Sequence, residues 1–220
     1  MNYKAVIFDF NGTLFFDNDK HVLAWNEISK LIRGHGISDH ELHEKFNGTP
    51  NAQNIQYMMN GKAANDEVNK YSLLKEEYYR KFCIADQKSF HLVAGATSYF
   101  DKLKELSIPF TIASASIKEN IDFFIESFKL DSWINVDNIV YDDGSYENKV
   151  KMFQEAALRL GYDVKDILVF EDSFSGIKNA YQAGIDKIVV IAPKEKELEY
   201  QNLPGVIKVI QDFREFDDLL

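Results

Sequence analysis

Hydrophobic residues in this chain cluster into short apolar runs that end in polar residues. The first run, residues 4–8, ends abruptly in Asp9, and a glycine and a threonine follow shortly afterwards. Similar runs return at residues 109–113, 138–141, 167–170, 187–191 and 206–210. A short, unbroken apolar run predicts a strand buried on both faces, as in a parallel sheet covered by helices.

Between most of these runs, apolar residues have the spacing of helices. The predicted helices cover residues 97–106, 118–128, 150–160 and 175–183. Strands that alternate with helices form right-handed βαβ units, which place helices on both faces of one parallel sheet. The pattern therefore predicts an α/β fold with a doubly wound parallel sheet.

The segment at residues 17–90 interrupts this alternation. Leu23, Trp25, Ile28 and Ile32 have helical spacing, and no strand-like run appears before residue 91. Glycine-containing breaks occur at residues 33–36, 47–50 and 59–61. We therefore expect three or four helices inserted into the α/β domain, which would then consist of residues 1–16 and 91–220.

Composition narrows the range of partners. The formal net charge is -10, from 35 acidic and 25 basic residues, so nonspecific binding to nucleic acid or to anionic membranes is not expected. Cys83 is the single cysteine and cannot form an internal disulfide. No apolar run approaches the roughly 20 residues of a membrane helix, and the N-terminal residues lack a signal-peptide pattern. These features predict a cytoplasmic protein.

Chemistry-bearing side chains follow three of the predicted strands. Asp9 ends the first, Ser114 follows the second, and Glu171 with Asp172 ends a later one. Because the carboxyl ends of parallel strands lie along one edge of a sheet, these residues are expected to converge. Clustered carboxylates repel one another unless a cation lies among them, and hard oxygen ligands suit Mg²⁺. The sequence therefore predicts a Mg²⁺ site.

Taken together, these motifs resemble those of haloacid dehalogenase superfamily hydrolases, in the branch of β-phosphoglucomutase and phosphoglycolate-type phosphatases. The residues that carry the resemblance are Asp9-Phe10-Asn11-Gly12-Thr13, Ser114, Lys149, Glu171-Asp172 and the segment from His21 to Trp25, which has the pattern H-x-x-A-W. The resemblance covers essentially the whole chain. It implies a Rossmann-like catalytic core, with residues 17–90 as a helical cap.

The resemblance also implies a role for each residue. Asp9 is expected to attack phosphorus. The phosphoryl group and substrate would be bound by Gly12, Thr13, His21, Ser114, Ala115 and Lys149. The Mg²⁺ ligands would be Asp9, the backbone carbonyl of Asn11, Glu171 and Asp172. The substrate would be a small phosphorylated metabolite, and the sequence predicts no particular oligomeric state, although a monomer is compatible with it.

Asn11 departs from the family pattern, in which a second aspartate occupies this position as the acid and base. An amide cannot protonate the leaving oxygen or activate water, and such assistance is typically worth about 10² to 10⁴ in rate. We therefore expect a phosphatase of reduced activity that favours acyl or aryl phosphates, whose leaving groups need no proton. His21 is a hypothetical substitute source of the proton.

Several alternatives remain open from the sequence. Lys151 competes with Lys149 as the phosphate-binding lysine, and Ser116 competes with Ser114 as the cap of the following helix. A sugar-phosphate mutase is a second possible function, although Asn51 replaces the expected cap arginine. Cleavage of a phosphonate C–P bond would need Lys20 or Lys45 to form an imine. A phosphate-binding protein with weakened catalysis is the remaining alternative.

Overall fold

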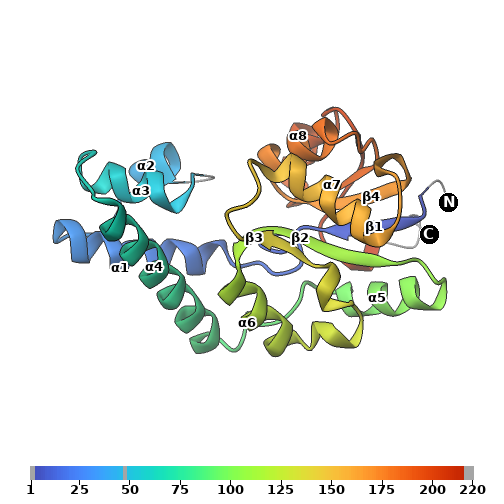
Figure 1. Cartoon of the computed structure of the whole chain (residues 1–220), viewed down its shortest axis with the longest axis horizontal. Helices are drawn as coiled ribbons and strands as arrows, with labels where there is room; N and C mark the ends of the chain where they lie inside the picture. The colour runs from blue at the N-terminus through green and yellow to red at the C-terminus, as the bar shows by residue number, and fades with distance from the viewer. Residues whose placement is uncertain (1–2, 47–48, 216–220) are drawn as a thin grey trace. The chain divides into compact units, whose positions relative to one another are not determined.

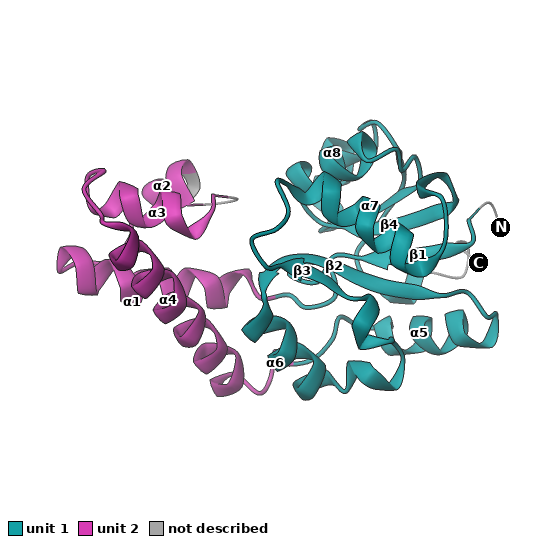
Figure 2. Ribbon diagram, in the orientation of Figure 1, with its two compact units in different colours: residues 1–16, 91–220 teal, residues 17–90 magenta. Residues whose placement is uncertain are grey.

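The computed structural model describes residues 3–46 and 49–215, and it contains two compact units. Unit 1 comprises Met1–Phe16 and His91–Leu220, and unit 2 comprises Asp17–Phe90 (Figure 2). Asn47 and Gly48, which belong to one of the predicted helix breaks, lie outside the described residues.

Unit 1 contains a six-stranded parallel sheet with the strand order β3-β2-β1-β4-β5-β6. The strands are β1 (Ala5–Phe8), β2 (Phe110–Ile117), β3 (Val140–Asp142), β4 (Ile167–Glu171), β5 (Ile188–Ile191) and β6 (Val206–Ile210). The α-helices are α5 (Ala96–Glu105), α6 (Lys118–Phe128), α7 (Lys149–Leu160), α8 (Phe174–Gln182) and α9 (Glu197–Tyr200). Helices α5 and α6 cover one face of the sheet and α7 and α8 the other (Figure 1), which confirms the predicted doubly wound fold.

The central strand β1 is buried because both of its faces are covered. Ile7 belongs to a core cluster that includes Phe153 of α7 and Ile177 of α8. On the opposite face, Phe8 packs edge-on against Phe100 of α5, with 5.3 Å between ring centroids. Successive side chains of a strand point to opposite faces, so a continuously apolar run is what a strand between two helical layers requires.

Strand β2 is longer than the sequence pattern indicated. We predicted a strand that ends at Ala113, whereas β2 continues to Ile117, with a shift of its register to β3 between Ser114 and Ile117. Helix α6 begins directly after it, and its N-cap residue is Ile117, without a side-chain cap. Neither Ser114 nor Ser116 therefore caps α6.

Unit 2 is helical in its described part. It contains α1 (Asn18–Arg33), α2 (Asp39–Glu41), a π-helical turn (Leu42–Phe46), α3 (Asn51–Met58) and α4 (Asn65–Ala85). Trp25 and Ile28 of α1 pack in one apolar cluster with Ile55 and Met58 of α3 and Phe46. No helix in the described part of the chain combines the length and apolar character of a membrane-spanning segment.

Candidate active site

The predicted site residues of unit 1 meet at the carboxyl ends of its central strands. Phe8 is in register with Ile112 of β2 and with Phe170 of β4. Asp9 therefore leaves β1 at the level where Glu171 ends β4. Carboxylate oxygens of Asp9, Glu171 and Asp172 lie within 4.8 Å of one another. Side chains from distant parts of the sequence thus converge as the parallel topology requires.

Lys149 joins two of these carboxylates. Its Nζ donates to Asp9 Oδ1 at 2.7 Å and also to Glu171 Oε1. Lys149 is the first residue of α7, where the side chain of Asn148 caps the helix by accepting from the Lys151 N–H. Lys151 is exposed, and its Nζ contacts Gln154. Of the two candidate lysines, the structure places Lys149 at Asp9.

Glu171 is fully buried and held through both oxygens. While Oε1 faces Lys149, Oε2 accepts from the N–H groups of Asp172 and Ser173, at 2.8 and 2.9 Å, and from Ser173 Oγ. A Cβ atom on Gly176 would overlap the Glu171 carboxylate. Glu171 thus fixes the loop that carries Asp172, and it needs the space that Gly176 leaves.

Gly12 has the same relation to Asp172. A Cβ atom at this position would overlap the Asp172 carboxylate, and the φ angle of Gly12 is +78°, in the region that favours glycine. The backbone after β1 can therefore approach Asp172 only because residue 12 lacks a side chain.

The electrostatic balance of this cluster is unfavourable for an ionised Asp9. Burial raises its pKa, and although Lys149 opposes this effect, the Glu171 carboxylate adds to it, so the pKa reaches about 7. The pKa of Lys149 is raised because Asp9 and Glu171 outweigh the effect of its burial. Three carboxylates lie close together here, and the one ammonium group among them contacts two, Asp9 and Glu171. A bound cation with hard-ligand preference would fit this donor set and would favour ionised Asp9.

Asn11 lies beside two serines of β2. Ser116 Oγ donates to Asn11 Oδ1 at 2.7 Å, and Ser114 Oγ lies 3.4 Å from the same atom. The N–H of Ser116 donates in turn to Ser114 Oγ at 3.2 Å. The residue that replaces the expected aspartate is therefore held through its amide oxygen.

The loop after β1 forms a tight turn. The Gly12 N–H donates to the Phe15 carbonyl at 2.8 Å, and the Thr13 N–H donates to the Phe10 carbonyl at 3.2 Å. Thr13 Oγ1 is buried and has no hydrogen-bond partner among the described residues. Ala115, another of the residues predicted to bind the phosphoryl group, is exposed on β2. Phosphate binding by these backbone groups stays a prediction.

His21 lies in unit 2, within a partly buried network. Its Nδ1 is 2.7 Å from Lys75 Nζ, its Nε2 is 3.4 Å from Asp17 Oδ2, and its ring stacks on Tyr79 with centroids 4.1 Å apart. An ammonium group can only donate, so Nδ1 accepts and the ring proton of the neutral tautomer lies on Nε2, toward Asp17. A role for His21 in proton transfer would have to compete with both contacts.

The same network ties Asn51 to α4. Glu76 Oε1 accepts from Asn51 Nδ2 and from Lys75 Nζ, both at 2.8 Å. Lys75 is 3 % exposed and Glu76 is 6 % exposed. Burial alone would raise the pKa of Glu76, but the charges of Lys75 and His21 and the hydrogen bonds from Lys75 and Asn51 lower it to about 2. The charge of Lys75 is therefore balanced inside unit 2.

This lowered pKa predicts how stability depends on pH. The ionised Glu76 stabilises the folded state above its ordinary pKa of 4.5, and this contribution is lost as the pH falls toward about 2. The shift corresponds to about 3 kcal/mol. We expect Glu76→Gln to lower the free energy of unfolding by roughly this amount at pH 6, and by less than half of it at pH 3, in urea titrations.

Glu77→Gln is the matched control for that measurement. Glu77 is the next residue of α4 but is exposed, and it pairs with exposed Lys81. Exposed pairs of this kind contribute about 0 to 1 kcal/mol. An equal loss in the two variants, or a Glu76→Gln loss that does not depend on pH, would contradict the assignment.

Sequence reasoning missed three residues of these networks. Ser116 was considered only as a helix cap, although residues two apart in a strand lie on the same face and Ser114 was already a candidate. Lys75 and Glu76 gave no signal, because adjacent opposite charges on a helix ordinarily face solvent. Their burial depends on the packing of α4 against α1.

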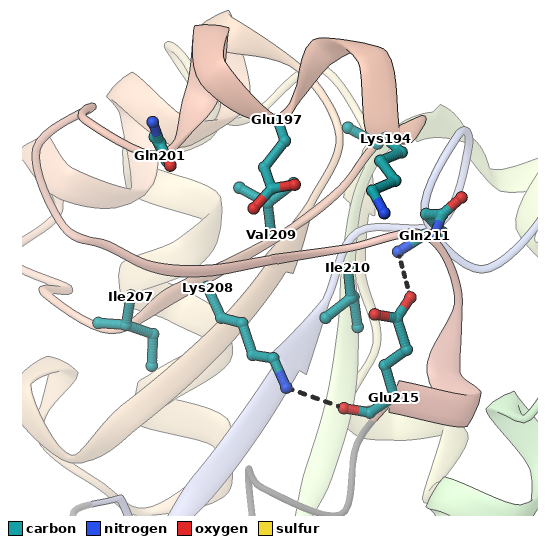
Figure 3. Close-up of a pocket in the computed structure, with 10 residues that line it drawn as sticks. Lys194, Glu197, Gln201, Ile207, Lys208, Val209, Ile210, Gln211 and Glu215 are labelled. Carbon is teal, nitrogen blue, oxygen red and sulfur yellow. Dashed lines mark hydrogen bonds between the residues drawn. The ribbon is translucent and has the colours of Figure 1, made fainter.

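A separate hollow of about 560 Å³ lies beside β6, at the edge of the sheet (Figure 3). Lys194, Glu197 and Lys208 line it, together with Glu215, whose Oε1 accepts from the Gln211 N–H at 2.9 Å. These charges are mixed in sign, and none of the predicted site residues lines the hollow. The carboxylate cluster beyond β1 and β4 is therefore a different place in unit 1.

Comparisons with known proteins identify the family of this chain. Residues 3–184 match the family model of haloacid dehalogenase-like hydrolases. A solved structure of a family IA, variant 3 hydrolase from Entamoeba histolytica is 34% identical, with a TM-score of 0.90, and the match covers 96% of this chain and 94% of that one.

More distant relatives have names that indicate their substrates. Validoxylamine A 7'-phosphate phosphatase of Streptomyces hygroscopicus is 24% identical over 83% of both chains. CbbY of Rhodobacter sphaeroides, solved in complex with xylulose-(1,5)bisphosphate, is 18% identical with a TM-score of 0.79, and the match covers 98% of this chain and 96% of that one. At this identity the likeness to CbbY shows the fold alone. The family model spans most of the chain, and the match to the Entamoeba hydrolase extends over nearly all of it, so this protein belongs to the haloacid dehalogenase-like hydrolases.

Proposed function

We propose that this chain is a Mg²⁺-dependent phosphatase that transfers the phosphoryl group of a small phosphorylated metabolite to Asp9 and then to water. The observation that carries the proposal is the contact of Asp9 with Lys149, beside the Glu171 and Asp172 carboxylates. The phosphatase from Streptomyces, which matches over 83% of both chains, supports the same reaction type.

The reaction has two displacements at phosphorus. In the first, a carboxylate oxygen of Asp9 attacks, the bond from phosphorus to the leaving oxygen breaks, and an aspartyl phosphate forms. In the second, water attacks phosphorus, the bond to Asp9 breaks, and inorganic phosphate leaves with regeneration of the carboxylate. Lys149 and the Ser114 hydroxyl are the side chains we assign to the phosphoryl oxygens, as electrostatic donors.

Asp9, Glu171 and Asp172 are the side chains that would hold Mg²⁺. The fit rests on the donor set, which consists of three clustered carboxylates with one ammonium group among them. When bound, the ion supplies positive charge that neutralises the phosphoryl oxygens and favours ionised Asp9. Glu171 is already engaged by Lys149 and by backbone N–H groups, so its main assigned role is to fix Lys149 and Asp172.

Contacts within unit 2 weigh against two of the alternative functions. A mutase that binds a second phosphate would benefit from a bidentate arginine, whereas Asn51 is neutral and donates to Glu76. Imine formation needs an unprotonated lysine. Of the two candidates, Lys20 and Lys45, this weighs against Lys20, which is buried but has a raised pKa because of its bonds to Asp19 and Asp86. Hydrolysis therefore remains the proposal.

The test is release of phosphate from acyl, aryl, sugar and nucleotide phosphates in the presence of Mg²⁺, by the wild type and by Asn11→Asp. We expect the wild type to act on acyl and aryl phosphates. Asn11→Asp should also act on alkyl phosphates. Its rate with them should exceed that of the wild type by a factor of about 10² to 10⁴, the usual contribution of general acid and base groups. If neither protein releases phosphate from any of these compounds, a phosphate-binding protein becomes the better account.

A further inference from the structure

Two hydroxyl groups of β2 converge on one atom of Asn11. Ser116 Oγ lies 2.7 Å from Oδ1, a normal hydrogen-bond length, whereas Ser114 Oγ lies 3.4 Å away. Because Ser114 Oγ accepts from the Ser116 N–H, its own hydrogen is free to point toward Asn11 or elsewhere. Ser116 therefore makes the principal contact with the amide oxygen.

The hydroxyl of Ser116 has no role in helix capping. Helix α6 begins at Lys118, and its N-cap residue Ile117 makes no side-chain bond to the helix. The serine is half-buried at the end of β2, and the Asn11 contact is the bond that its side chain makes. The described contacts thus give the Ser116 side chain no role within its own segment.

We infer that Ser116 is a positioning residue, which holds the Asn11 amide with its oxygen toward β2 and presents the NH₂ end to the oxygen that leaves phosphorus. The inference rests on the proposed phosphatase function. The two ends of an amide have opposite hydrogen-bonding character, so a reversed amide would place an acceptor oxygen against a leaving oxygen that gains negative charge. A serine hydroxyl can both donate and accept, so Ser116 anchors the amide in place, and the leaving oxygen, which only accepts, selects the NH₂ end.

This arrangement defines a substrate class. The leaving oxygen receives a hydrogen bond rather than a proton, so it must leave as a stable anion, as in acyl and aryl phosphates. The arrangement also separates the roles of the two serines. With Asn11 Oδ1 satisfied by Ser116, the long contact from Ser114 is easily given up, and the Ser114 hydroxyl can turn to the phosphoryl group.

A double-mutant cycle tests the inference. Wild type, Ser116→Ala, Asn11→Ala and the double variant are compared on aryl phosphates of graded leaving-group pKa. One lost hydrogen bond corresponds to a decrease in kcat/KM of roughly twofold to tenfold, and we expect a larger decrease for poorer leaving groups. In the Asn11→Ala background, Ser116→Ala should have no further effect. Equal decreases in both backgrounds, or none in either, would overturn the inference.

Two control variants separate positioning from general damage. Ser116→Thr keeps the hydroxyl group and should retain most of the activity and the same dependence on leaving group. Ser98→Ala makes the same chemical change at an exposed position of α5 and should match the wild type. Loss of activity in Ser116→Thr equal to that in Ser116→Ala would show that the hydroxyl is not what matters.

A spectroscopic measurement keeps the inference separate from the proposed function. The side-chain NH₂ signals of Asn11, identified by their absence in Asn11→Ala, should shift in Ser116→Ala and stay unchanged in Ser98→Ala. If phosphate is released but neither the signals nor the rates respond to Ser116→Ala, the inference fails and the phosphatase stands. If the signals shift but no compound is hydrolysed, the proposed function fails, and the catalytic part of the inference fails with it.

Discussion

Asp9→Asn is expected to release no measurable phosphate from any substrate of the wild type. The amide cannot form the aspartyl phosphate, and loss of a catalytic nucleophile in other hydrolases lowers kcat by a factor on the order of 10⁶. A stopped-assay comparison with a good aryl phosphate would measure this difference. Mass spectrometry of the acid-quenched wild type should also detect a phosphorylated chain that the variant lacks.

The variant must fold for this result to be informative. Asp9 is 5 % exposed, and its partner Lys149 keeps Glu171 when residue 9 becomes an amide. The buried pair of Lys149 and Glu171 should therefore preserve the local structure, and the near-ultraviolet circular dichroism spectrum should match that of the wild type. Substantial phosphate release by folded Asp9→Asn would exclude Asp9 as the nucleophile.

Lys149→Met should damage both stability and catalysis. The substitution keeps most of the side-chain length but leaves the buried carboxylates of Asp9 and Glu171 without their ammonium partner. Removing one partner of a buried ion pair costs about 3 to 5 kcal/mol. Loss of one electrostatic donor to the phosphoryl oxygens should lower kcat by roughly 10² to 10³. Urea unfolding and steady-state kinetics measure the two effects.

The stability of Lys149→Met should depend on pH and on Mg²⁺. Without the ammonium group, the pKa of Asp9 rises beyond the value of about 7 that it has in the wild type. The folded variant therefore binds a proton at Asp9 more readily than the unfolded chain does. The difference between wild type and variant in the free energy of unfolding should shrink as the pH falls toward 7 from above the raised pKa of Asp9. Adding Mg²⁺ at neutral pH should also stabilise the variant more than the wild type.

Lys151→Met is the matched control, because Lys151 is exposed and contacts only Gln154 among the described contacts of its ammonium group. We expect wild-type stability within about 0.5 kcal/mol, as for most surface substitutions, and unchanged kinetics. If Lys151→Met instead showed the larger loss of activity, the assignment of the phosphate-binding lysine would be reversed.

The choice between these lysines illustrates what the sequence could predict. Lys149 precedes Met152, Phe153 and Ala156 by three, four and seven residues, so it shares the face of α7 that packs on the sheet. Lys151 lies on the opposite side. The helical period thus indicated which lysine lies beside the sheet, but only if the helix begins at residue 149, whereas we predicted a start at residue 150.

The meeting of Asp9, Ser114, Glu171 and Asp172 was predictable for a different reason. The carboxyl ends of parallel strands lie along one edge of the sheet, so identifying the strands was enough to predict that these residues lie close together. The Ser116 contact was not predictable in this way, because the apolar run of β2 ends at Ala113 while its backbone stays extended to Ile117. Burial of Lys75 and Glu76 depends on tertiary packing and leaves no trace in local pattern.

The two glycines beside the carboxylates have a consequence for how this site can change over evolution. Gly176 makes room for Glu171, and Gly12 makes room for Asp172, although neither glycine carries a reactive group. The residue type at each glycine position therefore constrains the acid that faces it. A substitution of either glycine by a larger residue must be accompanied by a shorter or redirected acid. The site can therefore be lost through substitutions at positions that take no part in the reaction.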